Sequence, residues 1–206
     1  MNDSNRTGAA LFWDVLGKLG VDHLFGHTGS AVIPLHVELN KRMSLGKPVP
    51  RYSLPSGGGR PRGGGLCPAR ASGRIGVALA TSGPGATNLT TPIADAYKDS
   101  IPTVFITGQV PSFAIWTDAF QEVDTLGVTH PVSKHNYLVK DVADLEWVLH
   151  EAFHLVAADR PGPVVMDICK DVHLAAVGPG NPPPPAGAIT SRFPSIPLRR
   201  MPSSLP

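Results

Sequence analysis

Residues 75–88 read Ile75-Gly-Val-Ala-Leu-Ala80-Thr-Ser82-Gly-Pro-Gly-Ala-Thr-Asn88, and this stretch decides the fold. Its apolar beginning is typical of a parallel strand that is buried on both faces. The glycine-rich turn that follows opens a helix, which we expect to continue to about Tyr97. Such a turn can bring backbone N–H groups close to a ligand, at a helix start whose unpaired donors favour anions. It is neither a dinucleotide fingerprint nor a P-loop, so by itself it is equally consistent with a tight strand-to-helix connection.

Strand and helix patterns alternate on both sides of this stretch. Apolar residues recur at helical spacing in three segments, at 8–19, 31–39 and 142–158. Short apolar runs typical of buried strands occur at 21–25, 101–107, 136–139 and 163–168. The alternation predicts an α/β fold with a mainly parallel sheet flanked by helices. In such a fold, ligands bind outside the carboxyl ends of the strands.

Glycine and proline are unevenly placed. The chain has 22 of each among 206 residues, and six of the ten residues at 56–65 are glycine. Nine of the 29 residues at 178–206 are proline. We therefore expect four parts, in which only the second packs a core: a flexible N-terminus at 1–6, a folded domain at 7–173, an irregular Gly/Arg-rich insert inside it at 55–70 in place of a helix, and a disordered Pro-rich tail at 174–206.

Charge and composition argue against several classes of partner and compartment. The formal net charge is only +2, so we expect neither a nucleic acid nor a membrane as partner. Arg60 and Arg62 lie among glycines without interleaved aromatic residues, which does not favour a nucleic-acid segment. No apolar run is long enough to span a bilayer, and the first residues lead into an amphipathic pattern, so we expect no secretory signal. Cys67 and Cys169 are isolated thiols, so we expect a reducing, cytoplasmic location.

No metal site is expected, because none of the eight histidines stands at ligand spacing with Cys or carboxylate partners. Asp118, Glu122 and Asp124 form a cluster of carboxylates, which we interpret as the solvated face of a helix.

Many spaced motifs together resemble the large subunit of acetolactate (acetohydroxyacid) synthase, almost continuously over residues 74–172 and weakly over 7–45. They are Ala80-Thr-Ser-Gly-Pro-Gly-Ala-Thr-Asn-Leu89, Ile93-Ala-Asp-Ala-Tyr97, Asp99-Ser-Ile-Pro102, Ile106-Thr-Gly-Gln-Val-Pro111, Thr117-Asp-Ala-Phe-Gln-Glu-Val-Asp124, Lys134-His135, Leu138-Val-Lys140, Glu151-Ala-Phe-His154 and Arg160-Pro-Gly-Pro163 through Lys170-Asp-Val172.

The resemblance implies a thiamin-diphosphate (thiamine pyrophosphate) enzyme. Its family condenses two 2-oxoacids with loss of CO2 in branched-chain amino-acid biosynthesis, and its chains have three domains. This sequence resembles the first, the pyrimidine-binding domain, which grips the aminopyrimidine ring of the cofactor. Mg2+ and most of the FAD site belong to the other domains. Because sites in this family form between chains, the resemblance also implies a homodimer or pairing with an intact synthase subunit.

The resemblance also assigns residues. Phe120 and Gln121 are expected to face the reacting centre. The usual Phe-Gly-Tyr-Pro-Gly-Gly-Ala is here Phe25-Gly-His-Thr-Gly-Ser-Ala31, which lacks the Tyr-Pro pair and one glycine. Cofactor contacts are expected from Gly29, Ser30, Gly83, Pro84, Gly85, Asn88 and, toward FAD, Arg160. The substrate channel would be lined by Ala31, Val110, Pro111 and Ala119.

The expected catalytic acid is absent. Thiamin chemistry needs the aminopyrimidine to become its imino tautomer, which a carboxylate bonded to the ring nitrogen promotes. In the family this Glu lies roughly 24 residues before the Ser of Ser-Gly-Pro-Gly, which corresponds here to Gly58, and no carboxylate occurs between Glu38 and Asp95. Family sequence resumes at Ala69, so a compensated frameshift is our hypothesis for the Gly/Arg stretch.

We therefore expect an acetolactate synthase-like N-terminal domain that is truncated and inactive alone. Two alternatives stay open: a fragment of another thiamin-diphosphate carboligase or decarboxylase, such as glyoxylate carboligase, and a non-catalytic pseudo-subunit.

Overall fold

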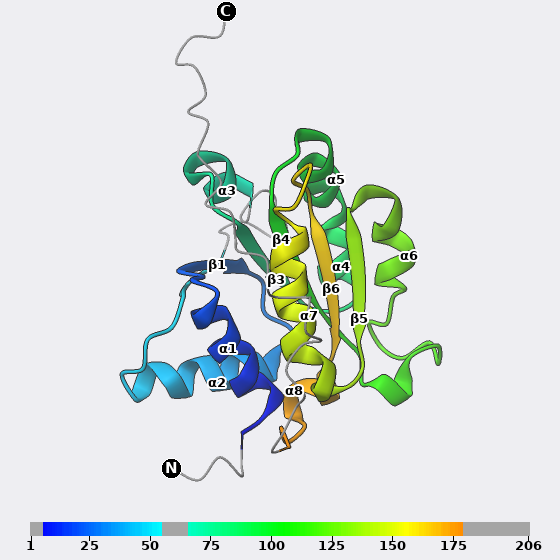
Figure 1. Cartoon of the computed structure of the whole chain (residues 1–206). Coiled ribbons are helices and arrows are strands. Elements are labelled where there is room, and N and C mark those ends of the chain that lie inside the picture. The colour runs from blue at the N-terminus through cyan, green and yellow to red at the C-terminus, as the bar shows by residue number, and fades with distance from the viewer. Residues whose placement is uncertain (1–5, 55–65, 179–206) are drawn as a thin grey trace, which may run out of the picture.

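A six-stranded sheet forms the centre of the computed structural model, which describes residues 6–54 and 66–178 (Figure 1). Its strands are β1 (His23–Gly26), β2 (Arg51–Ser53), β3 (Gly76–Ala80), β4 (Thr103–Gln109), β5 (His135–Val139) and β6 (Val164–Cys169). The order is β2-β1-β3-β4-β6-β5, and every neighbouring pair is parallel. This confirms the predicted α/β fold with a parallel sheet.

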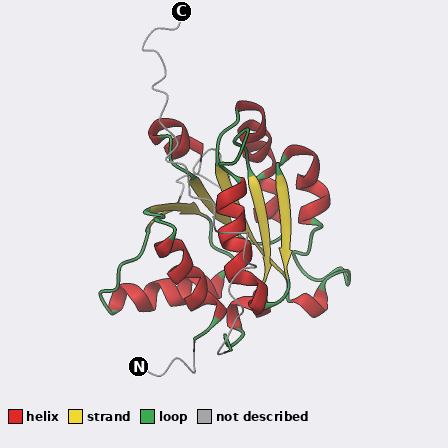
Figure 2. Cartoon of the chain, viewed as in Figure 1, coloured by secondary structure: helices red, strands yellow, loops and turns green. Residues whose placement is uncertain are grey.

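Helices lie on both sides of the sheet (Figure 2). They are α1 (Gly8–Lys18), α2 (Ile33–Ser44), α3 (Leu66–Ser72), α4 (Pro84–Asn88), α5 (Thr90–Asp99), α6 (Thr125–Thr129), α7 (Val142–Leu155) and α8 (Lys170–Leu174), with 3-10 turns at Ser112–Ala114 and His130–Val132. No helix in the described part of the chain is long and apolar enough to cross a membrane.

Alternate side chains of the central strands enter two separate cores, because successive residues of a strand point to opposite faces. The larger core packs these strands against α1, α2 and α7 through Val77, Leu79, Val104, Ile106, Val164 and Met166. The smaller core packs them mainly against α5 through Ala78, Ala80, Phe105 and Val165. Burial on both faces explains why the strands read as unbroken apolar runs rather than as alternating ones.

The two ends of the described domain are joined. The Gly8 amide donates to the Ala175 carbonyl at 2.9 Å, and the Val177 amide donates to the Arg6 carbonyl at 2.7 Å. Ordered structure therefore continues past the predicted boundary at 173, because these backbone groups pair with the start of α1. The remainder of the predicted tail, 179–206, and residues 1–5 lie outside the described residues.

Two elements differ from the sequence-based expectation. The short strand β2 was not predicted, since only three residues pair with β1 and they carry no apolar run. The predicted irregular insert at 55–70 ends in α3, whose Ala69 is buried in the smaller core. Residues 55–65 of that insert lie outside the described residues.

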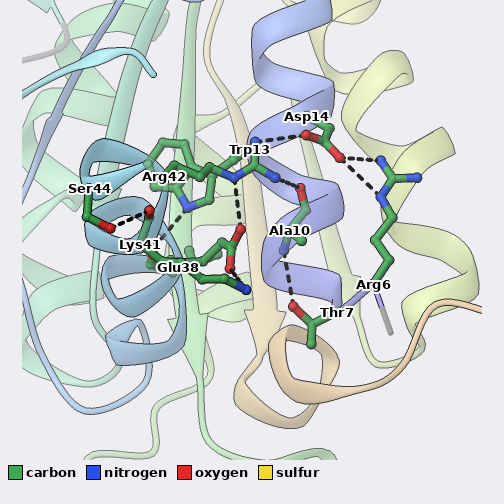
Figure 3. Close-up of polar contacts among 10 residues, drawn as sticks. Arg6, Thr7, Ala10, Trp13, Asp14, Glu38, Lys41, Arg42 and Ser44 are labelled. Carbon is green, nitrogen blue, oxygen red and sulfur yellow. Dashed lines mark hydrogen bonds and ion pairs between the residues drawn. The ribbon is translucent and has the colours of Figure 1, made fainter. Parts of the chain in front are cut away.

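A buried guanidinium clamps α1 to α2 (Figure 3). Arg42, only 8% exposed, pairs with Asp14 of α1 at 2.8 Å and with Glu38 of its own helix at 3.0 Å. It also donates to the Ala10 carbonyl at 2.8 Å, while Arg6 holds the second oxygen of Asp14 at 2.7 Å. This network fixes the helix that begins immediately after the first loop of the candidate site.

Candidate functional site

A cleft of about 350 Å3 lies at the carboxyl edge of the sheet. It forms where the chain leaves β1 and β3, the two strands from which the connections run to opposite sides of the sheet. In open α/β sheets this switch point is the usual place for a ligand. The cleft is lined by His27, Thr28, Gly29, Ser30, Thr81, Pro84, Gly85, Asn88, Phe120 and Gln121.

Most of the predicted site residues meet in this cleft. Gly29 and Ser30 come from the loop after β1, while Pro84, Gly85 and Asn88 come from the turn after β3. Phe120 and Gln121 arrive from the long connection between β4 and α6, far away in sequence. Three distant segments therefore supply one concave surface.

Thr81 joins the first two loops and was missed by sequence reasoning. A Cβ at Gly29 would lie 2.4 Å from the Thr81 Cβ, and a Cβ at Gly85 would lie 2.8 Å from its Cγ2. The Thr81 hydroxyl also accepts from the Ala31 amide at 3.3 Å. The two glycines are thus required by packing against one threonine, which itself lines the cleft. Its position between the apolar run and the glycine turn was the feature of the sequence that could have indicated Thr81 as a site residue.

Gln121 forms the third side of the cleft, and its backbone packs against Gly83. Gly83 has φ +58°, and a Cβ there would lie 2.8 Å from the Gln121 carbonyl oxygen. Gln121 itself has φ +61°. The Ser30 hydroxyl donates to the Gln121 side-chain oxygen at 3.4 Å, a long contact that links the first loop to the third. Phe120 projects beside it and is 86% exposed.

The cleft carries no carboxylate of its own. Its lining residues, all within the described part of the chain, include no Asp or Glu; His27 is the titratable side chain among them. The position expected for the catalytic Glu, Gly58, lies outside the described residues. The described surface offers hydrogen-bonding groups but supplies no general acid of the expected type.

The remaining predicted residues lie elsewhere. Ala31 and Val110 are buried and do not line the cleft, and Pro111 and Ala119 are half-buried on the β4–α6 connection. Arg160 lies at the opposite, amino edge of the sheet, where it donates to the Ser100 hydroxyl at 2.7 Å and to the Tyr97 and Lys98 carbonyls at the end of α5. The structure does not bring Arg160 to this cleft.

The carboxylates at 118–124 are not the solvated helix face that we expected. They lie on the connection before α6. Asp124 caps α6 by accepting from the Gly127 amide at 2.9 Å, and Glu122 accepts from backbone amides of its own loop. That interpretation is wrong because the segment satisfies its own backbone N–H groups instead of extending a helix.

A buried carboxylate, Asp167, was not anticipated; it lines a separate cavity of about 60 Å3 together with Glu122 and Asp124. It is fully buried on β6 and accepts from the Thr107 hydroxyl at 2.6 Å and from the Gln109 amide at 2.8 Å. Burial raises the pKa of Asp167 to about 6, against the lowering effect of these donors. The same Gln109 amide donates to the Val123 carbonyl at 2.8 Å, so it ties the sheet to the loop that carries Gln121.

No group of three or more His, Cys, Asp or Glu side chains in the described residues is arranged to hold a metal ion.

Comparisons with known proteins agree with this geometry. Residues 67–128 match the family described as thiamine pyrophosphate enzyme, N-terminal TPP binding domain. The chain is 46% identical to acetolactate synthase of Arthrospira platensis over 171 residues, which are 83% of this chain and 29% of that protein. It is 45% identical to the chloroplastic acetolactate synthase of Arabidopsis thaliana over 170 residues, 82% of this chain and 25% of that protein.

A third relative is the mitochondrial acetolactate synthase catalytic subunit of Saccharomyces cerevisiae, 42% identical over 185 residues, 90% of this chain and 26% of that protein. The predicted resemblance to acetolactate synthase is confirmed. The chain spans between a quarter and three tenths of the length of these relatives.

Proposed function

We propose that this acetolactate synthase-like N-terminal thiamine pyrophosphate domain supplies the aminopyrimidine-binding half of a thiamin-diphosphate site. The complete site would belong to an enzyme that condenses 2-oxoacids with loss of CO2. The observation that carries the proposal is the convergence of the loops after β1 and β3 with the Phe120–Gln121 segment at the switch point of the sheet.

The described residues fit the ring of this cofactor. A cleft of about 350 Å3 lies at the small end of the range for ligand sites, which suits one part of a cofactor rather than all of it. Gly29 and Gly85 line the cleft, and Asn88 and Gln121 contribute polar side chains to it. When bound, thiamin diphosphate supplies the stabilised carbanion that the condensation needs. The residues of this chain hold and orient the ring.

The chain alone is proposed to be inactive. The cleft residues include no carboxylate, and the sequence contains none between Glu38 and Asp95. Without an acid at the ring nitrogen, the cofactor lacks the proton partner that activates it. This observation also favours the second candidate function, a non-catalytic subunit that pairs with an intact synthase.

Exposed aromatic side chains on the β4–α6 connection, which also carries Gln121, support pairing with another chain. Phe113, Trp116 and Phe120 are 82%, 76% and 86% exposed and belong to one connection. Large apolar groups gathered on a surface mark interaction sites. We propose that a second copy or an intact synthase subunit covers them in a cytoplasmic assembly. Only the intact synthase subunit would provide the diphosphate and Mg2+ site and the rest of the FAD site.

Calorimetry with thiamin diphosphate and Mg2+ tests whether this chain is self-sufficient. We expect affinity no tighter than about millimolar, since one half of the site cannot offset the loss of freedom on binding. An assay for acetolactate formation from pyruvate, with Mg2+ and FAD present, should show no turnover. Micromolar affinity or measurable turnover would refute the incomplete-site proposal. Co-purification with a full-length synthase would support the pairing.

A further inference from the structure

The connection between β4 and α6 is folded around one of its own carboxylates. Glu122 accepts hydrogen bonds from the backbone amides of Trp116, Thr117 and Ala119, the last two at 3.3 and 3.1 Å. Three closely spaced backbone donors on one carboxylate form an anion-binding concavity of the kind that backbone nests make for phosphates. In this loop the bound anion is the side chain of Glu122 itself.

Backbone strain in this loop explains why an internal anion is needed. Trp116, Asp118 and Gln121 have φ of 68°, 55° and 61°, in the left-handed region that non-glycine residues rarely occupy. Each such residue costs about 1 kcal/mol or more and persists only where surrounding contacts hold it. The hydrogen bonds to Glu122 span this strained segment, and the Gln109 amide holds the following residue, Val123, at 2.8 Å.

The strained segment ends on the cleft. Gln121 precedes Glu122 directly, lines the cleft and lies so close to Gly83 that no Cβ fits between them. A shift of the loop therefore moves Gln121 against Gly83 and carries Phe120 with it. We propose that Glu122 is a positioning residue, whose ionised carboxylate holds Phe120 and Gln121 in place at the cleft. This assignment rests on the proposed function of the cleft.

The charge state of Glu122 is set by the same contacts. Hydrogen bonding from the Trp116 amide, and then from Ala119 and Thr117, lowers the pKa of Glu122 below its usual range. Asp118 lies on the same loop, and Asp124 and Asp167 line a cavity of about 60 Å3 together with Glu122. A titration of the loop must therefore be assigned by comparing variants.

Amide-resolved NMR and hydrogen exchange of the whole chain test the assignment. In E122Q, the Trp116, Thr117 and Ala119 amides should lose their downfield shifts and exchange roughly tenfold faster, as expected for loss of a charge-assisted hydrogen bond. The Gly83 and Gln121 signals should shift with them. The control D95N removes an exposed carboxylate on α5 and should change none of these signals. E122D keeps the charge on a shorter side chain, so its amide shifts and exchange rates should fall between those of E122Q and the wild type.

Acid titration of the wild type gives the same information without a variant. The three amides, Gly83 and Gln121 should move together in one step at a pH below the usual range of a glutamate pKa, and E122Q should lack that step. Altered nest amides with unchanged Gly83 and Gln121 would overturn the positioning role, as would a wild-type step that E122Q retains. None of these measurements needs a cofactor, so a failure to bind thiamin diphosphate would refute the proposed function separately.

Discussion

Thr81 occupies the space that a side chain on Gly29 would need, since a Cβ at Gly29 would lie 2.4 Å from the Thr81 Cβ. Real side chains do not approach so closely, so the loop after β1 and the start of the turn after β3 fit together only with glycine at 29. The contact lies in the wall of the candidate cleft, because both residues line it.

The first prediction concerns Gly29→Ala. The extra methyl must displace the loop, and overpacking of this kind costs about 1–3 kcal/mol of unfolding free energy. Gly17→Ala is the matched control: Gly17 lies inside α1 with open space around its Cβ position, so alanine should add about 0.5–1 kcal/mol there. Urea denaturation of both variants measures the difference, and equal effects would show that Thr81 does not constrain Gly29.

A second pair of glycines compares two positions of positive φ that have different surroundings. Gly83 and Gly46 have similar positive φ, +58° and +63°, but only a Cβ on Gly83 would meet a neighbour, the Gln121 backbone. Alanine is strained at both positions, and more so at Gly83, whose ψ of −117° lies outside the left-handed helical region. Gly83→Ala should therefore lower the unfolding free energy by more than Gly46→Ala, by about 1–3 kcal/mol for the contact. An equal loss in the two variants would place Gln121 away from Gly83.

Asp167 gives a pH-dependent prediction. Its pKa is about 6 in the folded chain and about 4 unfolded, so the folded state binds more protons between these values. The contribution of Asp167 to the free energy of unfolding is complete below pH 4 and is lost as pH rises through 6. The unfolding free energy of Asp167→Asn, relative to that of the wild type, should rise by about 3 kcal/mol between pH 4 and pH 8. Denaturant midpoints at several pH values measure this, and a difference that is independent of pH would contradict it.

His173 should give stability the opposite dependence on pH. It is 1% exposed on α8, neither ring nitrogen has a hydrogen-bond partner, and burial lowers its pKa to about 4. The unfolded chain then binds the extra proton between about pH 4 and 6.5, so this residue costs stability as pH falls through that window. His173→Phe should gain about 3 kcal/mol relative to wild type at pH 4 compared with pH 7. A gain that is the same at both values would mean that His173 is not buried neutral.

The sequence predicts the parts of this molecule that depend on local pattern. The apolar run at 75–80 became β3, and the glycine turn after it became one wall of the cleft. Phe120 and Gln121 were assigned to the site from the family resemblance rather than from any periodicity of the sequence. Those motifs are local strings, so they can be recognised without knowledge of the fold.

Contacts between distant segments could not be predicted. Thr107, Gln109 and Asp167 look like ordinary strand residues until β4 and β6 pair and bury the carboxylate. Glu122 looked solvated because its partners are backbone amides, which a side-chain pattern does not reveal. Arg160 carries the right motif, but its contacts in this chain are with α5.

Mapping thiamin diphosphate onto the chain by NMR tests the central claim most directly. Titration to millimolar concentration should shift the amides of Gly29, Ser30, Gly83, Gly85 and Gln121, with unchanged signals around Arg160 at the opposite edge of the sheet. Weak but localised shifts are the predicted result. Shifts centred outside the cleft, or no shifts at any concentration, would contradict the assignment of this surface to the aminopyrimidine ring.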